Sequence, residues 1–177
     1  MKRLIAKVAA TGLVGLLLAL TVWRLTHQSP PPKPGKPAPS FRLSMISTRG
    51  RLSLRQFEGK VVVLNFWSSS CEPCRKEMSA LESLYQRYRS RGLIVIGIDP
   101  EDFRGQARKF LEARAVTYPN VLDTSYAVTG AYAVAATPET FVIDRRGFLV
   151  GRPILGSIQD PENQRALVPA ITKLLDA

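Results

Sequence analysis

The sequence has 177 residues, enough for one ordinary domain with a single core once an apolar amino-terminal segment is set aside. Hydrophobic residues make up 45% and charged residues 22%, values near the globular average that exclude extensive disorder. The net charge of +11 raises nucleic-acid binding, but the basic residues are spread along the chain among acids and no nucleic-acid-binding motif accompanies them, so we expect no nucleic-acid partner.

The amino terminus has the pattern of an export signal, because three basic residues in Met1–Lys7 precede an uncharged stretch at 8–23. The apolar run from Leu4 to Leu25 is long enough to cross a bilayer core, for which about 20 residues suffice. We therefore expect residues 1–28 to be a signal anchor, a single transmembrane helix that leaves the rest of the protein on the extracytoplasmic side of the cell membrane. Cleavage of this segment, which would release a secreted or periplasmic protein, is the alternative.

Residues 29–40 contain six prolines in twelve positions, a composition that cannot form a helix or pack a core. We predict a stiff polyproline linker, which at about 3.1 Å per residue would hold a domain roughly 35 Å from the membrane. The remaining residues, 41–177, are expected to form one domain.

Two apolar runs with many β-branched residues, Val61–Phe66 and Leu93–Ile98, predict buried strands of a partly parallel sheet. Between them, Glu72–Arg91 places apolar residues at spacings of three and four, as in an amphipathic helix. Strand, helix and strand make a βαβ unit. A second helix is expected over Phe103–Ala113, with one apolar side made of Phe103, Ala107, Phe110 and Leu111.

The last part of the sequence predicts a hairpin followed by a helix. Thr140–Asp144 and Phe148–Gly151 flank a turn in which Gly147 can take the positive φ that a hairpin needs. Pro161–Asp176 has the pattern of a covering helix, which Pro169 can kink. Its buried side is expected to contain Leu167, Val168, Ile171, Leu174 and Leu175. The order β, α, β, α, β, β, α predicts one α/β domain with a mixed β-sheet flanked by helices.

The only two cysteines, Cys71 and Cys74, come directly after a predicted strand and at the start of the helix that follows it. Free N–H groups at a helix amino terminus favour a thiolate, which lowers the pKa of Cys71 below the value of about 8.5 for a free thiol. We expect Cys71 to attack a substrate disulfide and Cys74, one helical turn later, to resolve the mixed disulfide. Pro73 stiffens the turn between them.

Two other uses of the cysteine pair are less favoured. A purely stabilising disulfide across so short a loop would gain little from chain entropy. A zinc site would need further ligands, and the only histidine, His27, lies beside the apolar amino-terminal segment. We therefore expect neither a metal nor a bound cofactor.

Two stretches carry a resemblance to a known family. The run Val61–Trp67 followed by Cys71–Glu77 resembles the exported thioredoxin-like proteins of the TlpA and ResA type. Thr137 and Pro138, with the strand pattern that follows them, resemble the segment of that family that contains a cis-proline. The resemblance covers roughly residues 37–175, and it implies a thioredoxin-like fold and the activity of a protein-disulfide reductase.

The resemblance also implies roles for individual residues. Pro138 would lie across from the dithiol, and the backbone amide and carbonyl of Thr137 would pair with the backbone of a substrate. Trp67 matches an aromatic residue that we expect to pack in the core. The family usually carries Trp directly before the first cysteine, whereas this chain has Ser68-Ser69-Ser70, so a substrate-facing aromatic is missing.

Three further polar residues bear on the chemistry of the cysteines. Asn65 occupies the position where cytoplasmic thioredoxins place a buried proton-accepting Asp, and Glu77, one helical turn after Cys74, is the expected replacement. Glu72 is the alternative, and for either glutamate a solvated residue at the start of a helix is the plain structural interpretation. A carboxylate near the dithiol raises the pKa of a thiol and biases the pair toward donating electrons.

The resemblance implies a reductant outside the cytoplasm, with apocytochrome c as a client and a membrane electron donor that re-reduces the dithiol. Oxidative folding or isomerisation of exported proteins is the main alternative. A thiol peroxidase is less favoured: Ser68 lies three residues before Cys71, as in peroxiredoxins, but position 64 is Leu where those enzymes carry Pro. A copper carrier is disfavoured because it would need a His within the domain.

Overall fold

The computed structural model describes residue 12 and residues 15–20 and 31–177. Most of the expected signal anchor, residues 1–28, lies outside these described residues, so that expectation stays a prediction. Among the described residues, no helix is long and apolar enough to span a membrane. Residues Pro31–Ala177 form a unit of their own, separate from Met1–Pro30.

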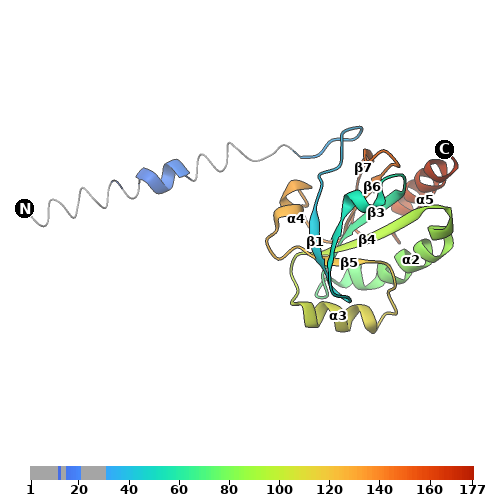
Figure 1. The fold of residues 1–177 in the computed structure, drawn as a ribbon, viewed down its shortest axis with the longest axis horizontal. Coiled ribbons are helices and arrows are strands. Elements are labelled where there is room, and N and C mark those ends of the chain that lie inside the picture. The colour runs from blue at the N-terminus through green and yellow to red at the C-terminus, as the bar shows by residue number, and fades with distance from the viewer. Residues whose placement is uncertain (1–11, 13–14, 21–30) are drawn as a thin grey trace, which may run out of the picture. The chain divides into compact units, whose positions relative to one another are not determined.

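The Pro31–Ala177 unit is built on a seven-stranded sheet with the strand order β2-β1-β5-β4-β3-β6-β7 (Figure 1). The neighbours β3, β4 and β5 are parallel, and β1 and β6 flank them as antiparallel strands. The sheet is therefore mixed, as expected. The strands are β1 (Arg42–Met45), β2 (Arg51–Ser53), β3 (Val61–Phe66), β4 (Leu93–Asp99), β5 (Asn120–Leu122), β6 (Glu139–Ile143) and β7 (Leu149–Leu155).

Helices cover both faces of this sheet. The helices are α2 (Glu72–Tyr88), α3 (Arg104–Glu112), α4 (Ala127–Ala131) and α5 (Pro161–Asp176), with short 3₁₀ helices at Leu54–Phe57 and Arg89–Arg91. Side chains of α2, α3 and α5 share one core cluster with β3 and β4, and α4 contributes to a second cluster on the other face. Because β3, β4 and β7 all end at the same edge of the sheet, the helices that follow them, α2, α3 and α5, all begin there.

The long predicted elements are confirmed, and the short ones were missed. Strands β3 and β4, helix α2, the β6–β7 hairpin and α5 lie where the patterns placed them. Two side chains expected on buried helix faces are exposed: Phe103 precedes α3 at its N-cap position and is 85% exposed, and Val168 on α5 is 37% exposed. Phe110 and Leu174 are partly buried. Phe103 falls outside the helix because its backbone is extended (φ −72°, ψ 142°), so helical spacing does not apply to it.

The Pro-rich segment 29–40 differs from the predicted free linker, because its described part is bound to the domain. Gly35 N donates to Leu149 O at 2.7 Å, Leu149 N donates to Lys36 O at 2.9 Å, and Ala38 N donates to Gly147 O at 2.9 Å. Prolines lack the N–H that a central strand needs but tolerate a sheet edge, and β7 is an edge strand. The residues between the prolines supply the donors and acceptors. The segment therefore covers part of the outer strand β7, whose backbone N–H and C=O groups would otherwise be open to pairing with another chain.

Gly97 in β4 allows the Trp67 ring to pack closely against the sheet. A Cβ on Gly97 in β4 would lie 1.8 Å from Asn120 Oδ1 and 2.7 Å from Trp67 Nε1. These two atoms form a hydrogen bond of 2.9 Å, and the Trp67 ring, which is fully buried, stacks on Phe110. Trp67 is thus packed in the core, as expected. The close approach of its ring to β4 requires glycine at position 97.

We expect Gly97→Ala to lower the free energy of unfolding by about 3 kcal/mol, because the added methyl group must displace a buried hydrogen-bonded pair. Urea denaturation followed by circular dichroism measures this change. Gly105→Ala is the matched control: nothing lies within 4 Å of its Cβ, and Ala favours the helix, so stability should stay level or rise by up to about 1 kcal/mol. Equal losses in the two variants would contradict the packing explanation.

Candidate active site

The two cysteines lie at the edge of the sheet where the parallel strands β3, β4 and β5 end and where β6 begins. We call this edge, with its loops at 67–71, 100–103, 123–126 and 132–138, the dithiol edge. Cys71 is the N-cap residue of α2, and Pro73 lies in the first turn of that helix. The strand–loop–helix context expected for the pair is therefore present.

In this structure Cys71 and Cys74 form a disulfide, with their Cα atoms 5.3 Å apart. Cys74 N donates to Cys71 Sγ at 3.2 Å, so a helix-terminal amide points at the first sulfur. Cys71 is partly exposed, whereas Cys74 is fully buried. A reaction partner can therefore reach the sulfur of Cys71 but not that of Cys74. Within the part of the chain that the structure describes, no cluster of His, Cys, Asp or Glu could hold a metal ion.

Glu77 and Asn65, two residues that the sequence singled out separately, are in contact below the dithiol. Asn65 on β3 donates through Nδ2 to Glu77 Oε1 at 2.8 Å and to Thr140 Oγ1 at 3.0 Å. The second carboxylate oxygen of Glu77 accepts a hydrogen bond of 2.8 Å from Ile158 N. Both Glu77 and Cys74 are fully buried and stand one helical turn apart, which places their Cβ atoms about 5–6 Å from each other.

Burial raises the pKa of Glu77 to about 7, although the hydrogen bonds from Ile158 and Asn65 favour the charged form. A carboxyl group with this pKa can both accept and release a proton near neutral pH. Asn65 Oδ1 is buried and has no hydrogen-bond partner among the described residues. If the amide turned over, this oxygen would accept a hydrogen bond from the protonated carboxyl group of Glu77, so Asn65 can pair with either protonation state of Glu77.

Glu72 occupies a different environment, and the plain structural interpretation holds for it. Its carboxylate lies at the surface, 3.6 Å from Arg75 Nε and 3.8 Å from Lys76 Nζ on the next turn of α2. Exposed ion pairs of this kind contribute little stability. The charge of the Glu72 carboxylate is therefore screened by solvent and by its two basic neighbours. Of the two glutamates, Glu77 alone is buried beside the dithiol.

The peptide bond between Thr137 and Pro138 is cis, as the resemblance implied. Pro138 is buried directly before β6, and Glu139, the first residue of β6, pairs with Phe66, the last residue of β3. Pro138 therefore lies at the dithiol edge. The backbone amide and carbonyl of the partly exposed Thr137 bind no other described residue, so both remain free to pair with an incoming chain.

A pair of acidic side chains that sequence reasoning missed holds the loop before Cys71. Asp102 accepts hydrogen bonds from Ser69 N at 2.7 Å and from Ser69 Oγ at 2.8 Å. Asp99, the fully buried last residue of β4, in turn accepts from Asp102 N at 3.0 Å. Burial raises the pKa of Asp99 to about 7, and the neighbouring Asp102 carboxylate acts in the same direction. An acid at the end of an apolar strand was the signal in the sequence that could have found this pair.

Glu139 is a third buried acid at the dithiol edge that sequence reasoning missed. Its carboxylate accepts a hydrogen bond of 3.0 Å from Ala135 N, within the loop that leads to Pro138. Burial raises the pKa of this carboxyl group. Glu139 follows Pro138 directly, so this hydrogen bond helps to fix the loop that presents Thr137.

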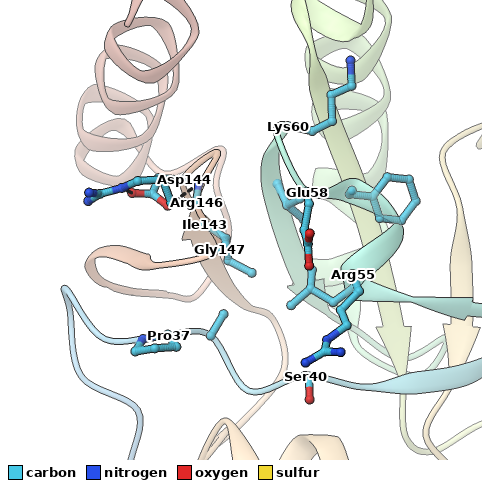
Figure 2. A pocket seen from close by; sticks show the side chains of 13 residues that line it. Pro37, Ser40, Arg55, Glu58, Lys60, Ile143, Asp144, Arg146 and Gly147 are labelled. Atoms are coloured by element: carbon cyan, nitrogen blue, oxygen red, sulfur yellow. Dashed lines mark hydrogen bonds and ion pairs between the residues drawn. The ribbon is translucent and has the colours of Figure 1, made fainter.

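A separate hollow of about 370 Å³ lies at the opposite edge of the sheet, between the start of β3 and the end of β6. Figure 2 shows Arg55, Glu58 and Lys60 on one side of it and Asp144 and Arg146 on the other. None of the predicted site residues lines this hollow. The chemistry of the cysteines therefore belongs to the exposed dithiol edge and not to this cavity.

Comparisons with known proteins identify the family of this chain. The family model described as AhpC/TSA family matches residues 34–152. The thiol-disulfide oxidoreductase ResA of Bacillus subtilis (strain 168) is 36% identical over 116 residues, which are 66% of this chain and 64% of the relative. The ResA of Geobacillus kaustophilus (strain HTA426) is 33% identical over 133 residues, 75% of each chain. The chain spans about two thirds to three quarters of the length of these curated relatives.

Solved structures show the same fold. A thiol:disulfide interchange protein, DsbE, from Chlorobium tepidum superposes with a TM-score of 0.75 at 28% identity, covering 81% of this chain and 99% of that one. A protein disulfide isomerase from Bacteroides thetaiotaomicron gives a TM-score of 0.73 at 28% identity, with 82% and 92% covered. The chain belongs to the AhpC/TSA family and is a ResA-like thiol-disulfide oxidoreductase of thioredoxin-like fold, with its CXXC disulfide at Cys71 and Cys74.

Proposed function

We propose that the protein reduces disulfide bonds in client polypeptides outside the cytoplasm. The observation that supports electron transfer from the dithiol to the client is the burial of Glu77 one helical turn from Cys74. A negative charge on Glu77 disfavours a thiolate on Cys74 and so destabilises the reduced form of the pair. A dithiol whose reduced form is destabilised gives up its two electrons readily.

The reaction begins on the reduced protein with the exposed sulfur. The Cys71 thiolate attacks one sulfur of the client disulfide, forms a Cys71–client disulfide and releases the other client sulfur, which takes up a proton. The Cys74 thiol then gives its proton to the Glu77 carboxylate and attacks Cys71 Sγ. The second client sulfur leaves as a thiolate, which takes up a proton from solvent, and the Cys71–Cys74 disulfide seen in this structure forms. Two electrons have passed from the dithiol to the client.

Thr137 and Pro138 supply the backbone part of client binding. The unpaired amide and carbonyl of Thr137 can form hydrogen bonds with an extended client segment, as at an open strand edge. Pro138 lies at the same edge as Cys71, which keeps such a segment beside the reacting sulfur. These hydrogen bonds are independent of the client's side chains, so they support binding of many sequences.

The proposal also includes a client, an electron donor and a location. The resemblance to ResA-type proteins supports apocytochrome c as a client, and a membrane dithiol donor would return the two electrons after each turnover. The export pattern of residues 1–28 supports a single-pass membrane anchor with the domain on the extracytoplasmic side.

A redox titration tests the direction of electron flow. We expect a reduction potential nearer to about −270 mV, typical of a reductant, than to about −120 mV, typical of a strong oxidant. Equilibration of the protein with defined ratios of reduced and oxidised dithiothreitol, followed by thiol alkylation and mass spectrometry, measures it. A potential at or above about −120 mV would overturn the reductase proposal in favour of oxidative folding.

A further inference from the structure

We infer that Phe103 binds an apolar side chain of the client next to the client's reacting cysteine. The inference rests on the proposed function and adds a preference among clients. Phe103 is 85% exposed, the highest value among the exposed large apolar side chains of the Pro31–Ala177 unit. Local structure gives no reason for a Phe here, because it occupies the N-cap position of α3, where Ser, Thr, Asp and Asn are preferred, and its side chain makes no capping hydrogen bond.

The loop that carries Phe103 is fastened to the loop that carries Cys71. The residue before Phe103, Asp102, accepts two hydrogen bonds from Ser69, and Gln106 on the first turn of α3 donates to Ser69 Oγ at 2.8 Å. Ser69 precedes Cys71 by two residues, which span at most about 7 Å. Phe103 is therefore held within reach of a client segment whose sulfur meets Cys71.

Phe103 and Cys71 also lie on the same side of the sheet. They occupy the N-cap positions of α3 and α2, which pack in the same core cluster and begin at the same edge. The segment Ser68–Ser70 offers no apolar side chain of its own beside Cys71. The Phe103 ring thus supplies apolar surface on the α3 side of the dithiol that the loop before Cys71 lacks.

A client polypeptide explains this exposed ring better than a small disulfide or a second copy of the chain. A polar small disulfide such as oxidised glutathione gains nothing from an aromatic ring. A second copy placed permanently over Phe103 would cover the neighbouring Cys71, the sulfur that a reaction partner must reach. A transient client segment with an apolar residue near its cysteine buries the ring only while the disulfide reacts.

The test compares two disulfide-linked peptides that differ only by Leu or Ser beside the reacting cysteine, with oxidised glutathione as a third substrate. We expect the reduced full-length protein to favour the Leu peptide by about tenfold or more in kcat/KM, and Phe103→Ser to remove this preference without changing the rate with glutathione. Val168→Ser, at an exposed apolar position on α5, should leave all three rates unchanged.

Three outcomes would overturn the inference. A preference for the Leu peptide that survives in Phe103→Ser would place the contact elsewhere, and an equal loss on all three substrates would show that Phe103 only maintains the loop. A wild-type dimer that becomes a monomer in Phe103→Ser would show that the ring binds a second copy. If the wild type reduces none of the disulfides, the proposed function itself fails, which is distinct from uniform reduction without a preference.

Discussion

Cys71→Ser is expected to abolish disulfide reduction, whereas Cys74→Ser is expected to capture the client. Cys71 is the exposed sulfur, so its loss removes the attacking group and should lower the rate at least about 1,000-fold. Cys74 is fully buried, and its loss leaves the Cys71–client disulfide without a resolving thiol. Non-reducing electrophoresis of the Cys74→Ser protein from cells should show a mixed disulfide that disappears with dithiothreitol.

The double variant Cys71→Ser, Cys74→Ser is the control, and it should capture nothing. Mass spectrometry of the captured species identifies the client and tests apocytochrome c directly. Capture by Cys71→Ser in place of Cys74→Ser would reverse the two roles. If neither single variant forms a mixed disulfide, the proposed reductase role loses its support.

Glu77→Gln is expected to slow the second step about 100-fold at pH 7 while leaving the first step unchanged. The buried carboxylate accepts the proton of Cys74, and general base catalysis of this kind contributes about 100-fold or more. Gln keeps the size of Glu77 and one of its two acceptor oxygens, but it cannot take up the proton. Rapid-mixing kinetics with a disulfide-linked fluorescent peptide separates formation of the mixed disulfide from its decay.

The pH dependence of the second step distinguishes this role from a structural one. In the wild type the step should accelerate as pH rises through about 7, the pKa of Glu77, since only the ionised form accepts a proton. In Glu77→Gln this inflection should be absent, because no group titrates at position 77. Glu72→Gln is the matched control on the same helix, where the carboxylate is exposed and paired with Arg75 and Lys76. Equal effects of the two substitutions would contradict a specific role for Glu77.

The stability of the wild type should also change with pH, with a sign that the pKa of Glu77 defines. The folded-state pKa of Glu77 is raised from 4.5 to about 7, so the folded state binds its proton more tightly than the unfolded state. The folded protein therefore loses roughly 3 kcal/mol of stability as pH rises from about 4.5 to about 7. Asp99 and Glu139, whose pKa values are also raised by burial, contribute losses of the same sign in both proteins. Urea denaturation of the oxidised protein should therefore show a loss that is smaller in Glu77→Gln than in the wild type by roughly this amount.

The parts of the fold that long patterns specify could be predicted. The run Val61–Phe66 is apolar throughout, and the apolar spacing of α2 extends over several turns, so both elements were found with their ends nearly correct. Strand β5 has only three residues, Asn120–Leu122, and α4 has five, Ala127–Ala131. A period of two or of 3.6 cannot be recognised over so few positions, and these elements form because neighbouring strands and the core hold them.

In the active site, too, features formed by residues close in sequence could be predicted, and contacts between residues far apart in sequence could not. Cys71, Cys74 and Glu77 lie on two consecutive turns at the start of α2 and could be found from their spacing and from the family resemblance. The contact between Asn65 and Glu77 depends on how α2 packs against β3, and the bonds between Ser69 and Asp102 join residues 33 positions apart. Phe103 was placed on the wrong surface because its spacing fits the pattern of α3 although its backbone does not. These two contacts and the exposure of Phe103 depend on how the elements pack together, which no local sequence pattern specifies.

The attachment of the Pro-rich segment changes where the domain is held. Gly35 and Lys36 bond to Leu149 at the start of β7, and β7 begins at the edge of the sheet opposite Cys71. Any tether formed by the residues before Pro31 therefore joins the domain at the end of the sheet opposite Cys71. Because the chain is attached to the domain from Gly35 onward, such a tether is shorter by about 19 Å than an extended chain to position 40 would be.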